Sequence, residues 1–324
     1  MLFIDNQDNH EPALNLALEE YCALNWPQQD SYFLLYVNSP CLVLGKNQNT
    51  LEEINHRFAK AQNIDVLRRI SGGGTVYHDL GNINFSFICP HDQKKVANFR
   101  WFNEPVCAAL NDLGVPAEIN KRGDLIAEGR KISGNAQYTS KRMMFSHGTL
   151  LFDSNLEYLE RALDVCIGRV ESKSMKSVRS KVQNIKPYLS PDWTLPLFKS
   201  YLAEKICGIN HASISPTSTE WAAIHDLAQS KYKSWEWNFG RSPECSIQKE
   251  ANTNRPFALT IQLASGCIFK DFEVLTPHIF SEELLNDLRK VLSGVPYESS
   301  ALLQVLEKYF QNPHQAQEWL DWLF

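Results

Sequence analysis

Three consecutive glycines preceded by two arginines are the part of this sequence best suited to chemistry. Residues 68–75 read Arg-Arg-Ile-Ser-Gly-Gly-Gly-Thr. Successive glycines cost backbone entropy, so a plain linker explains them poorly. Their N–H groups can converge on an anion, and Arg68 and Arg69 would add fixed charge that suits phosphate or carboxylate. A tight hairpin beside a solvated arginine pair would look the same, so spacing alone leaves both interpretations open.

Two common phosphate-binding motifs do not account for this stretch. The sequence contains no G-x-x-x-x-G-K-[ST] loop. It also differs from a G-x-G-x-x-G turn that opens a helix, because a strand-like segment follows the glycines.

Lys131 is the second candidate, within Gly-Arg-Lys-Ile-Ser-Gly-Asn-Ala at 129–136. Small neighbours would let its ammonium group project into a pocket and meet a phosphate or carboxylate as a point charge. Taken alone, a lysine that protects an edge strand from aggregation is the commoner explanation. His147 and His78 could act as bases, although an isolated histidine is more often a structural hydrogen-bonding residue.

The segment from Arg169 to Lys181 is strongly basic, with Glu171 as its acidic residue. Most such runs are solvated surface. A flexible basic loop can also close over a nucleotide, so both interpretations remain.

Apolar periodicity indicates the elements that must position these residues. A helix is predicted from Pro12, and the runs 32–37 and 41–44 suggest a strand pair across Asn-Ser-Pro. A strand at 65–70 leads directly into the glycines. Further strands are predicted on both sides of a turn at 79–82 and at 124–127, 131–138 and 143–152, with helices near 51–61 and 101–113 and from 156.

A second, smaller domain is predicted at the C-terminal end. The pattern of residue types along the sequence changes around 235–243, so we place the domain boundary there. The two predicted domains are residues 1–244 and 245–324. The second part pairs two strand candidates, 257–263 and 267–275, and continues with helical patterns near 282–292, 301–310 and 315–323, which suits a small α+β domain.

Composition narrows the class of protein. The chain has 324 residues, 44% of them hydrophobic and 21% charged, with a net charge of -5. The hydrophobic and charged fractions are ordinary for a globular enzyme. The negative net charge argues against the basic surface that a nucleic-acid-binding protein needs. The eight cysteines are scattered without a C-x-x-C pair, and neither a signal peptide nor a membrane span is recognisable. We therefore expect a cytoplasmic protein that binds neither nucleic acid nor membrane.

Taken together and in this order, the motifs resemble the lipoate–protein ligase A family. Residues 68–87 resemble its hallmark RRxSGGGxVYHDLGNxNFSF nearly throughout, and 129–137 resemble its G-(K/R)-K-x-S-G-x-A-Q segment. HGTLLFD at 147–153, KSVRSKVQNI at 176–185 and WEWNFGRSP at 235–243 are also similar to family sequence. The resemblance thus covers almost the whole chain.

This resemblance implies a fold and an activity. The fold would be α+β, with a large mixed-sheet catalytic domain of the biotin/lipoate ligase type and a small α+β C-terminal domain. The enzyme would join lipoate to AMP from ATP, with Mg2+ carried by the ATP, and then pass the lipoyl group to a lysine. The acceptors would be apo lipoyl domains of 2-oxoacid dehydrogenase complexes and glycine-cleavage H protein. The enzyme is expected to be a monomer.

The resemblance also carries site residues onto this sequence. Besides the matched positions that are given at the end of this paragraph, Asp124 and His147 are candidate site residues. No set of metal ligands is expected from the protein alone. One departure stands out, because Gly123 replaces the asparagine of the usual R-N-D-[IL] motif. The matched positions are Arg69, Gly74, Thr75, Val76, Tyr77 and Lys131 for ATP, Ser71, Gly72, Gly73, His78 and Lys131 for lipoate, and Ser177, Val178 and Arg179 in a loop closing over the adenylate.

Lys131 is the candidate for the catalytic residue. Attack of a carboxylate on the α-phosphate brings two anions together, so placed cations and N–H donors address the main barrier. We expect Lys131 to bridge the two groups and expect no covalent acyl-enzyme.

Other functions compete with this one. An octanoyl or lipoyl acyltransferase of the same fold would work without ATP through an activated cysteine, for which Cys89, Cys107 and Cys166 are the candidates nearest to Lys131 in sequence. A lipoyl-AMP transferase would use pre-made adenylate, and a regulatory module would bind ligand without catalysis. Biotin ligation is disfavoured because that family's glycine-rich loop differs around the arginines.

Overall fold

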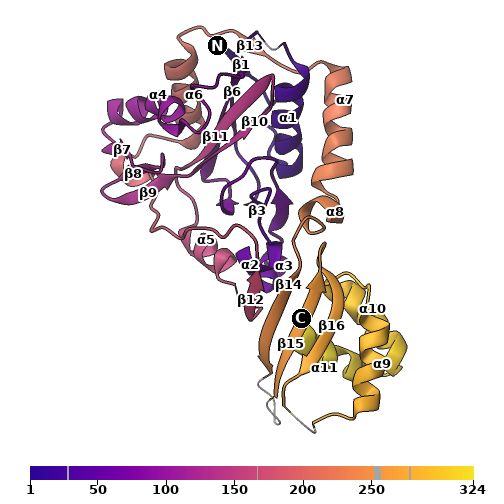
Figure 1. Cartoon of the computed structure of the whole chain (residues 1–324). Coiled ribbons are helices and arrows are strands. Elements are labelled where there is room, and N and C mark those ends of the chain that lie inside the picture. Colours follow the sequence, from indigo (N-terminus) through magenta and orange to yellow (C-terminus); the bar gives the residue numbers. More distant parts are fainter. Residues whose placement is uncertain (28, 166, 252–256, 277–278) are drawn as a thin grey trace.

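The computed structural model describes residues 1–27, 29–165, 167–251, 257–276 and 279–324, and shows a larger body followed by a smaller one (Figure 1). The α-helices are α1 (Pro12–Asn25), α2 (Thr50–Glu53), α3 (His56–Ala61), α4 (Phe99–Asp112), α5 (Leu156–Leu163), α6 (Leu195–Cys207), α7 (Ser218–Leu227), α8 (Trp235–Asn238), α9 (Glu282–Leu292), α10 (Ser299–Phe310) and α11 (Pro313–Leu323). A 3₁₀ turn at Lys186–Tyr188 and a π-helical turn at Ala228–Tyr232 supplement them.

The strands assemble into a mixed sheet and three smaller sheets. The mixed sheet has the order β10-β11-β6-β2-β1-β13, with β1 parallel to both β2 and β13 and the other neighbours antiparallel. The strands are β1 (Leu2–Ile4), β2 (Tyr32–Tyr36), β3 (Cys41–Leu44), β4 (Asp65–Arg68), β5 (Val76–His78), β6 (Asn82–Pro90), β7 (Ala117–Ile119), β8 (Leu125–Ala127), β9 (Arg130–Ser133), β10 (Asn135–Thr139), β11 (Met143–Leu151), β12 (Arg169–Ser172), β13 (Ser213–Ile214), β14 (Cys245–Ala251), β15 (Phe257–Ala264) and β16 (Ile268–Val274).

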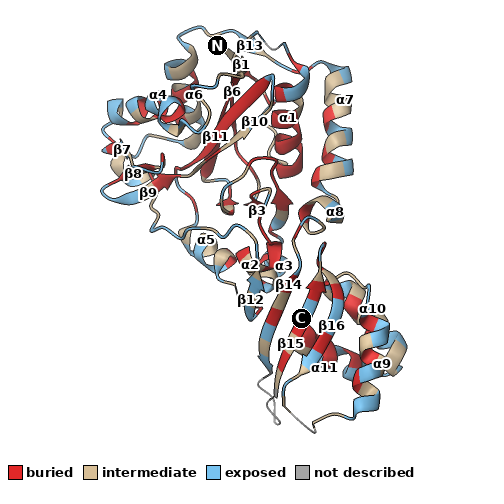
Figure 2. Ribbon diagram, viewed as in Figure 1, coloured by how far each residue is buried: buried red, intermediate tan, exposed pale blue. Residues whose placement is uncertain are grey.

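Helices cover both faces of the mixed sheet. Along β2, Phe33 and Leu35 belong to the core formed with α4 and α6, whereas Leu34 and Tyr36 belong to the core formed with α1. This division follows from the alternation of side chains along a strand. Because both faces are covered, β2, β6 and β11 are buried almost throughout (Figure 2). The predicted α+β architecture is confirmed.

Two small sheets position the candidate residues. The sheet β4-β3-β5 holds the glycine turn between β4 and β5, and the sheet β7-β8-β9 carries Lys131. The predicted pairing of residues 32–37 with 41–44 is wrong, because β2 lies in the mixed sheet and β3 pairs with β4 and β5. The strand predicted at 131–138 is interrupted at Gly134, so that β9 and β10 belong to different sheets.

Arg68 ties the loop between β3 and α2 to the end of α8 rather than facing a ligand. Its side chain is fully buried, and its guanidinium donates to the carbonyls of Gly45, Gln48 and Asn238 and to the Thr50 hydroxyl. The expectation that both arginines supply charge to an anion is therefore wrong for Arg68. Burial lowers the pKa of Arg68 to about 10, which leaves it charged near neutral pH.

The smaller body has its own core, formed where α9, α10 and α11 pack against β14, β15 and β16. Its sheet has the order β12-β14-β15-β16, so a strand from the basic segment 169–181 completes it. Sequence analysis left this segment as a loop and did not predict β12. Within the part of the chain that the structure describes, no helix combines the length and apolarity needed to cross a bilayer.

Candidate active site

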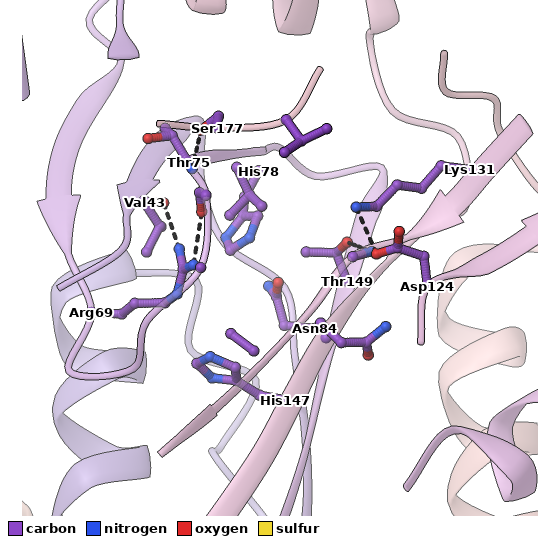
Figure 3. Close-up of a pocket in the computed structure, with 18 of the residues that line it drawn as sticks. Val43, Arg69, Thr75, His78, Asn84, Asp124, Lys131, His147, Thr149 and Ser177 are labelled. Carbon is purple, nitrogen blue, oxygen red and sulfur yellow. Dashed lines mark hydrogen bonds and ion pairs between the residues drawn. The ribbon is translucent and has the colours of Figure 1, made fainter. Parts of the chain in front are cut away.

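A cavity of about 370 Å³ opens where the mixed sheet meets the two small sheets (Figure 3). The glycine turn contributes Gly73 and Gly74, β5 contributes His78, and β9 contributes Lys131. Residues from three sheets and from the basic segment thus surround one space of small-molecule size.

The glycine turn packs tightly against the chain just after β3. Gly73 has a φ of 88°, a conformation that a residue with a side chain rarely adopts. Gly45 packs so closely that a Cβ there would collide with the Gly73 carbonyl oxygen. These constraints explain the glycines at positions 45 and 73.

Arg69 stabilises the glycine turn through hydrogen bonds to its carbonyl groups. Its Nη2 donates to the carbonyls of Gly72 and Gly74 at 2.6 and 2.7 Å, and its Nη1 donates to the carbonyl of Val43 at 2.9 Å. Burial lowers the pKa of Arg69 to about 10, partly offset by the charge of Glu19. Arg69 thus lies at the cavity wall as a cation and fixes the shape of the turn.

A buried chain of hydrogen bonds connects Glu19 to Arg69. The Glu19 carboxylate lies 2.9 Å from Nδ1 of His147, and Nε2 of His147 lies 2.7 Å from the Ser71 hydroxyl. Ser71 in turn accepts from Nε of Arg69 at 2.9 Å. A neutral ring in this position donates through Nδ1 to Glu19 and accepts the Ser71 proton through Nε2. His147 and Ser71 were predicted as site residues, whereas Glu19 was not.

Lys131 carries its charge into the cavity. Its Nζ lies 2.8 Å from a carboxylate oxygen of Asp124, and about a quarter of its side chain is exposed. The Lys131 backbone is tied to the basic segment, since its N–H donates to Lys181 and its carbonyl accepts from Gln183. Lys131 and the glycine turn, which lie far apart in sequence, therefore line the same space (Figure 3).

The loop that was expected to close over the adenylate is docked at Ser177. The Ser177 hydroxyl accepts from the Thr75 N–H at 2.9 Å and from Gln48 Nε2 at 3.0 Å, and it donates to Glu53. The Ser177 N–H also donates to Glu53, at 3.0 Å. This loop therefore forms part of the cavity wall.

The remaining predicted residues occupy different surroundings. Thr75, Val76 and Val178 line the cavity, whereas the Tyr77 side chain is buried in an apolar cluster and leaves only its backbone for a ligand. Arg179 is largely exposed, 4.0 Å from Asp164, and lines a wider hollow behind the loop.

Glu19, Gln48 and Glu53 are functional candidates that sequence analysis missed. Polar residues inside otherwise apolar helical patterns were the available signal for Glu19, since it lies in the sequence LNLALEEYCAL. The contacts of Gln48 and Glu53 with Ser177 span more than a hundred residues and leave no local pattern.

The structure offers no support for a cysteine nucleophile at this cavity. Cys89 is buried in the main core. Cys107 lies on α4, and its thiol donates a hydrogen bond to the Ala117 carbonyl. Burial raises the pKa of both thiols, which opposes formation of a thiolate. Cys166 lies outside the described residues, and no cysteine of the described ranges lines the cavity.

Comparisons with known proteins agree with this architecture. Residues 11–207 match the family described as the lipoyl protein ligase A/B catalytic domain. A lipoate–protein ligase of Bacillus subtilis is 41% identical, with 100% of each chain covered. A lipoate–protein ligase A solved with bound ATP has a TM-score of 0.60 at 27% identity, covering 74% of this chain and 96% of that one.

A third comparison extends the likeness to a two-part enzyme. The bipartite lipoate–protein ligase of Thermoplasma acidophilum, solved in a study of that ligase and its E2 lipoyl domain, has a TM-score of 0.62 at 25% identity. It covers 73% of this chain and 95% of its own. The predicted fold of the biotin/lipoate ligase type is confirmed, and the chain belongs to the lipoate–protein ligase A family.

Proposed function

We propose that this chain is an ATP-dependent lipoate–protein ligase. It converts lipoate and ATP to lipoyl-AMP and pyrophosphate, and then transfers the lipoyl group to a lysine of an acceptor protein. The observation that carries the proposal is the convergence of the Lys131 ammonium and the glycine turn on one cavity. A relative named lipoate–protein ligase, which matches this chain along its entire length, supports the proposal.

In the first step, Lys131 offsets the repulsion between the lipoate carboxylate and the α-phosphate of ATP. Its ammonium already lies beside a carboxylate, that of Asp124, at 2.8 Å, so the position suits a carboxylate ligand. The N–H groups of the glycine turn supply donors that need no reorganisation as charge develops on the phosphate. Arg69, behind the turn, adds positive charge and holds its shape.

In the second step, the acyl-adenylate is already activated, so the enzyme needs mainly to position the incoming lysine amine. No residue of the chain forms a covalent bond to the acyl group in this scheme. Apo lipoyl domains of 2-oxoacid dehydrogenase complexes and glycine-cleavage H protein are the proposed acceptors. The archaeal ligase that was studied together with its E2 lipoyl domain supports an acceptor of this class.

Magnesium enters this scheme with the nucleotide. The described residues contain no cluster of three or more histidine, cysteine, aspartate or glutamate side chains that could hold a metal ion. Mg2+ commonly keeps its waters and binds through phosphates and one or two carboxylates. Asp124 is the acidic side chain at the cavity wall and fits as a single additional ligand, while Mg2+ would neutralise phosphate charge.

The organisation of the chain completes the proposal. Residues 1–244 form the catalytic domain and 245–324 an accessory domain, and the enzyme acts as a cytoplasmic monomer. The apolar core where α9, α10 and α11 pack against β14, β15 and β16 supports the division, with Leu51 and Ile167 of the first part extending into it.

The proposal is tested by incubating the protein with lipoate, MgATP and an apo lipoyl domain. We expect release of pyrophosphate and a mass increase of one lipoyl group on the domain. Lipoylation without ATP from an acyl carrier protein would point instead to an acyltransferase. Transfer from lipoyl-AMP but not from lipoate and ATP would indicate an enzyme that lacks the activation step.

A further inference from the structure

A basic surface begins at the cavity and continues onto α4. Arg122 lines the cavity and is exposed, so the cavity reaches solvent beside it. The turn that holds Arg122 packs against the first residue of α4, because a Cβ on Gly123 would lie 2.5 Å from Cβ of Phe99. Arg100, the next residue of α4, is exposed (Figure 1). The mouth of the cavity and the start of α4 therefore share one surface.

The segment between β6 and α4 extends this surface along β10, the edge strand of the mixed sheet. Gln137 on β10 accepts from the Ala97 N–H at 2.7 Å and donates to the Lys95 carbonyl at 3.1 Å. Farther along, the His91 N–H donates to the carbonyl of Arg142, in the turn between β10 and β11. The start of α4, the segment and the turn are therefore continuous.

This surface has a local excess of positive charge. Residues 91–104, 120–124 and 139–143 contain seven lysines and arginines against three acidic residues, whereas the whole chain has a net charge of -5. In the part of the chain that the structure describes, Arg100 alone of the seven forms an ion pair, with Glu104 at 3.8 Å. We call this surface the basic strip, and its members are Lys94, Lys95, Arg100, Lys121, Arg122, Lys141 and Arg142.

The basic segment 169–181 differs from the basic strip, because carboxylates of the chain itself face several of its cations. Lys176 lies 3.2 Å from Glu52, and Arg169 lies 3.0 Å from Glu171. The charges of the basic strip are instead mostly left for a partner.

An exposed aromatic ring lies within the basic strip. Trp101 is 43% exposed, and Nζ of Lys95 lies 4.0 Å from the centroid of its ring. Tryptophan is enriched at protein–protein interfaces. A basic surface with an aromatic ring also suits single-stranded nucleic acid. Continuity with the mouth of the cavity, which the acceptor lysine has to enter, favours a protein.

We propose that the basic strip is the docking surface for the acceptor protein and selects acceptors that are acidic around their target lysine. The inference rests on the proposed function and names the feature of the partner that this enzyme recognises. The acceptor lysine has to reach the cavity, so the surface around that lysine must lie against the mouth. Carboxylates on that surface are attracted to the unpaired cations, which speeds encounter and fixes orientation.

The test separates docking from adenylate formation. The triple variant Lys94→Glu, Lys141→Glu and Arg142→Glu reverses three exposed charges that do not line the cavity. Lipoylation of an apo lipoyl domain with acidic residues around its lysine measures kcat/KM for the acceptor. A burst of pyrophosphate without acceptor measures the first step. We expect kcat/KM for the acceptor to fall roughly 10-fold or more, mainly through KM, and the burst to stay unchanged.

A matched control carries the same change in charge on the C-terminal body. Lys270→Glu, Lys290→Glu and Lys308→Glu together should leave both measurements unaltered. Added salt should weaken the acceptor reaction of the unchanged protein more than that of the first triple variant. Changing the acidic residues of the acceptor to amides should remove most of the difference between the unchanged protein and that variant, because both changes abolish the same contacts.

Equal kcat/KM for the acceptor in the unchanged protein and the first triple variant overturns the inference, as does an equal loss in the matched control. Binding of a single-stranded oligonucleotide that the first triple variant loses, with unchanged acceptor kinetics, assigns the surface to nucleic acid instead. Failure of the proposed function is a different result, since the unchanged protein would then release no pyrophosphate from lipoate and MgATP.

Discussion

The ammonium of Lys131 and the carboxylate of Asp124 form an ion pair of 2.8 Å inside the proposed site. Asp124 is itself held by Asn120, whose Nδ2 donates to its second oxygen and whose Oδ1 accepts from its N–H. Lys131 is thus held in position before any substrate arrives. Substrate anions must compete with Asp124 for the same ammonium, which makes Lys131 the most informative residue to remove.

Lys131→Ala is expected to lower the rate of adenylate formation by on the order of 100-fold or more, because a preorganised cation is lost from the transition state. The rate is measured as pyrophosphate release with saturating lipoate and MgATP. Lys121→Ala removes an exposed charge from the nearby turn and serves as the control. A mutant that keeps the normal rate would show that Lys131 does not contact the reacting groups.

Glu19→Gln is expected to lower the free energy of unfolding by about 1–3 kcal/mol, because the buried His147 and Arg69 lose their anionic partner. Urea unfolding followed by tryptophan fluorescence measures the change. Glu118→Gln, at the exposed position of β7, provides the control. Equal stability of both variants would mean that the buried chain from Glu19 to Arg69 adds nothing to the fold.

Ser177→Ala is expected to free the loop, since it removes the contacts with Thr75, Gln48 and Glu53 that depend on the hydroxyl. Limited trypsin digestion should then cut after Lys176 or Arg179 several-fold faster, because proteolysis tracks local opening. Ser190→Ala, outside this loop, controls for general effects. Unaltered cleavage would indicate that Ser177 does not anchor the loop.

Acid should destabilise the protein partly through His78. Its folded pKa of about 3 lies below the unfolded value of about 6.5, so the unfolded chain binds the proton first as the pH falls. The stabilisation is present above pH 6.5 and declines toward pH 3, with a slope approaching 1.4 kcal/mol per pH unit. Unfolding free energies of the unchanged protein and of His78→Gln, measured across this range, should therefore converge at acid pH. Parallel curves would show that His78 does not have a lowered pKa in the folded protein.

Gly123→Asn, which restores the residue usual in the family motif, is expected to destabilise this chain. Gly123 has a φ of 85°, and a Cβ there would lie 2.5 Å from Cβ of Phe99. The cost should be about 1–3 kcal/mol, as for other overpacked sites. Thermal unfolding measures it, and Phe99→Gly in the same chain should recover part of the loss. An equally stable single variant would show that Phe99 moves aside without cost.

The site was predictable where its chemistry is local in sequence. The glycine turn, Lys131 and Ser177 each lie in a recognisable motif, and the structure brings all three to one cavity. Glu19 was missed because its partner His147 is 128 positions away, and only the folded chain shows that α1 faces β11. Arg68 and Arg69 look alike in sequence, but only Arg69 of the two reaches the cavity, because neighbouring positions on β4 and its extension face opposite ways.

Strand pairing was harder to predict than strand location. The segments of β2 and β3 were found, yet their short connection suggested a hairpin that the structure does not form. Each pairs with strands distant in sequence, and no local pattern specifies such partners. The interruption at Gly134 was also missed, although it turns the chain from the sheet that carries Lys131 into the mixed sheet.

The pairing of β12 with β14 means that the C-terminal body is not a self-sufficient module. A chain ending before β14 would leave β12 with an open hydrogen-bonding edge, and a separately produced C-terminal fragment would expose the matching edge of β14. Such edges attract other chains. Attempts to exchange or graft this body between related enzymes should therefore transfer Arg169–Ser172 together with it, although that strand precedes the loop of the active site in the sequence.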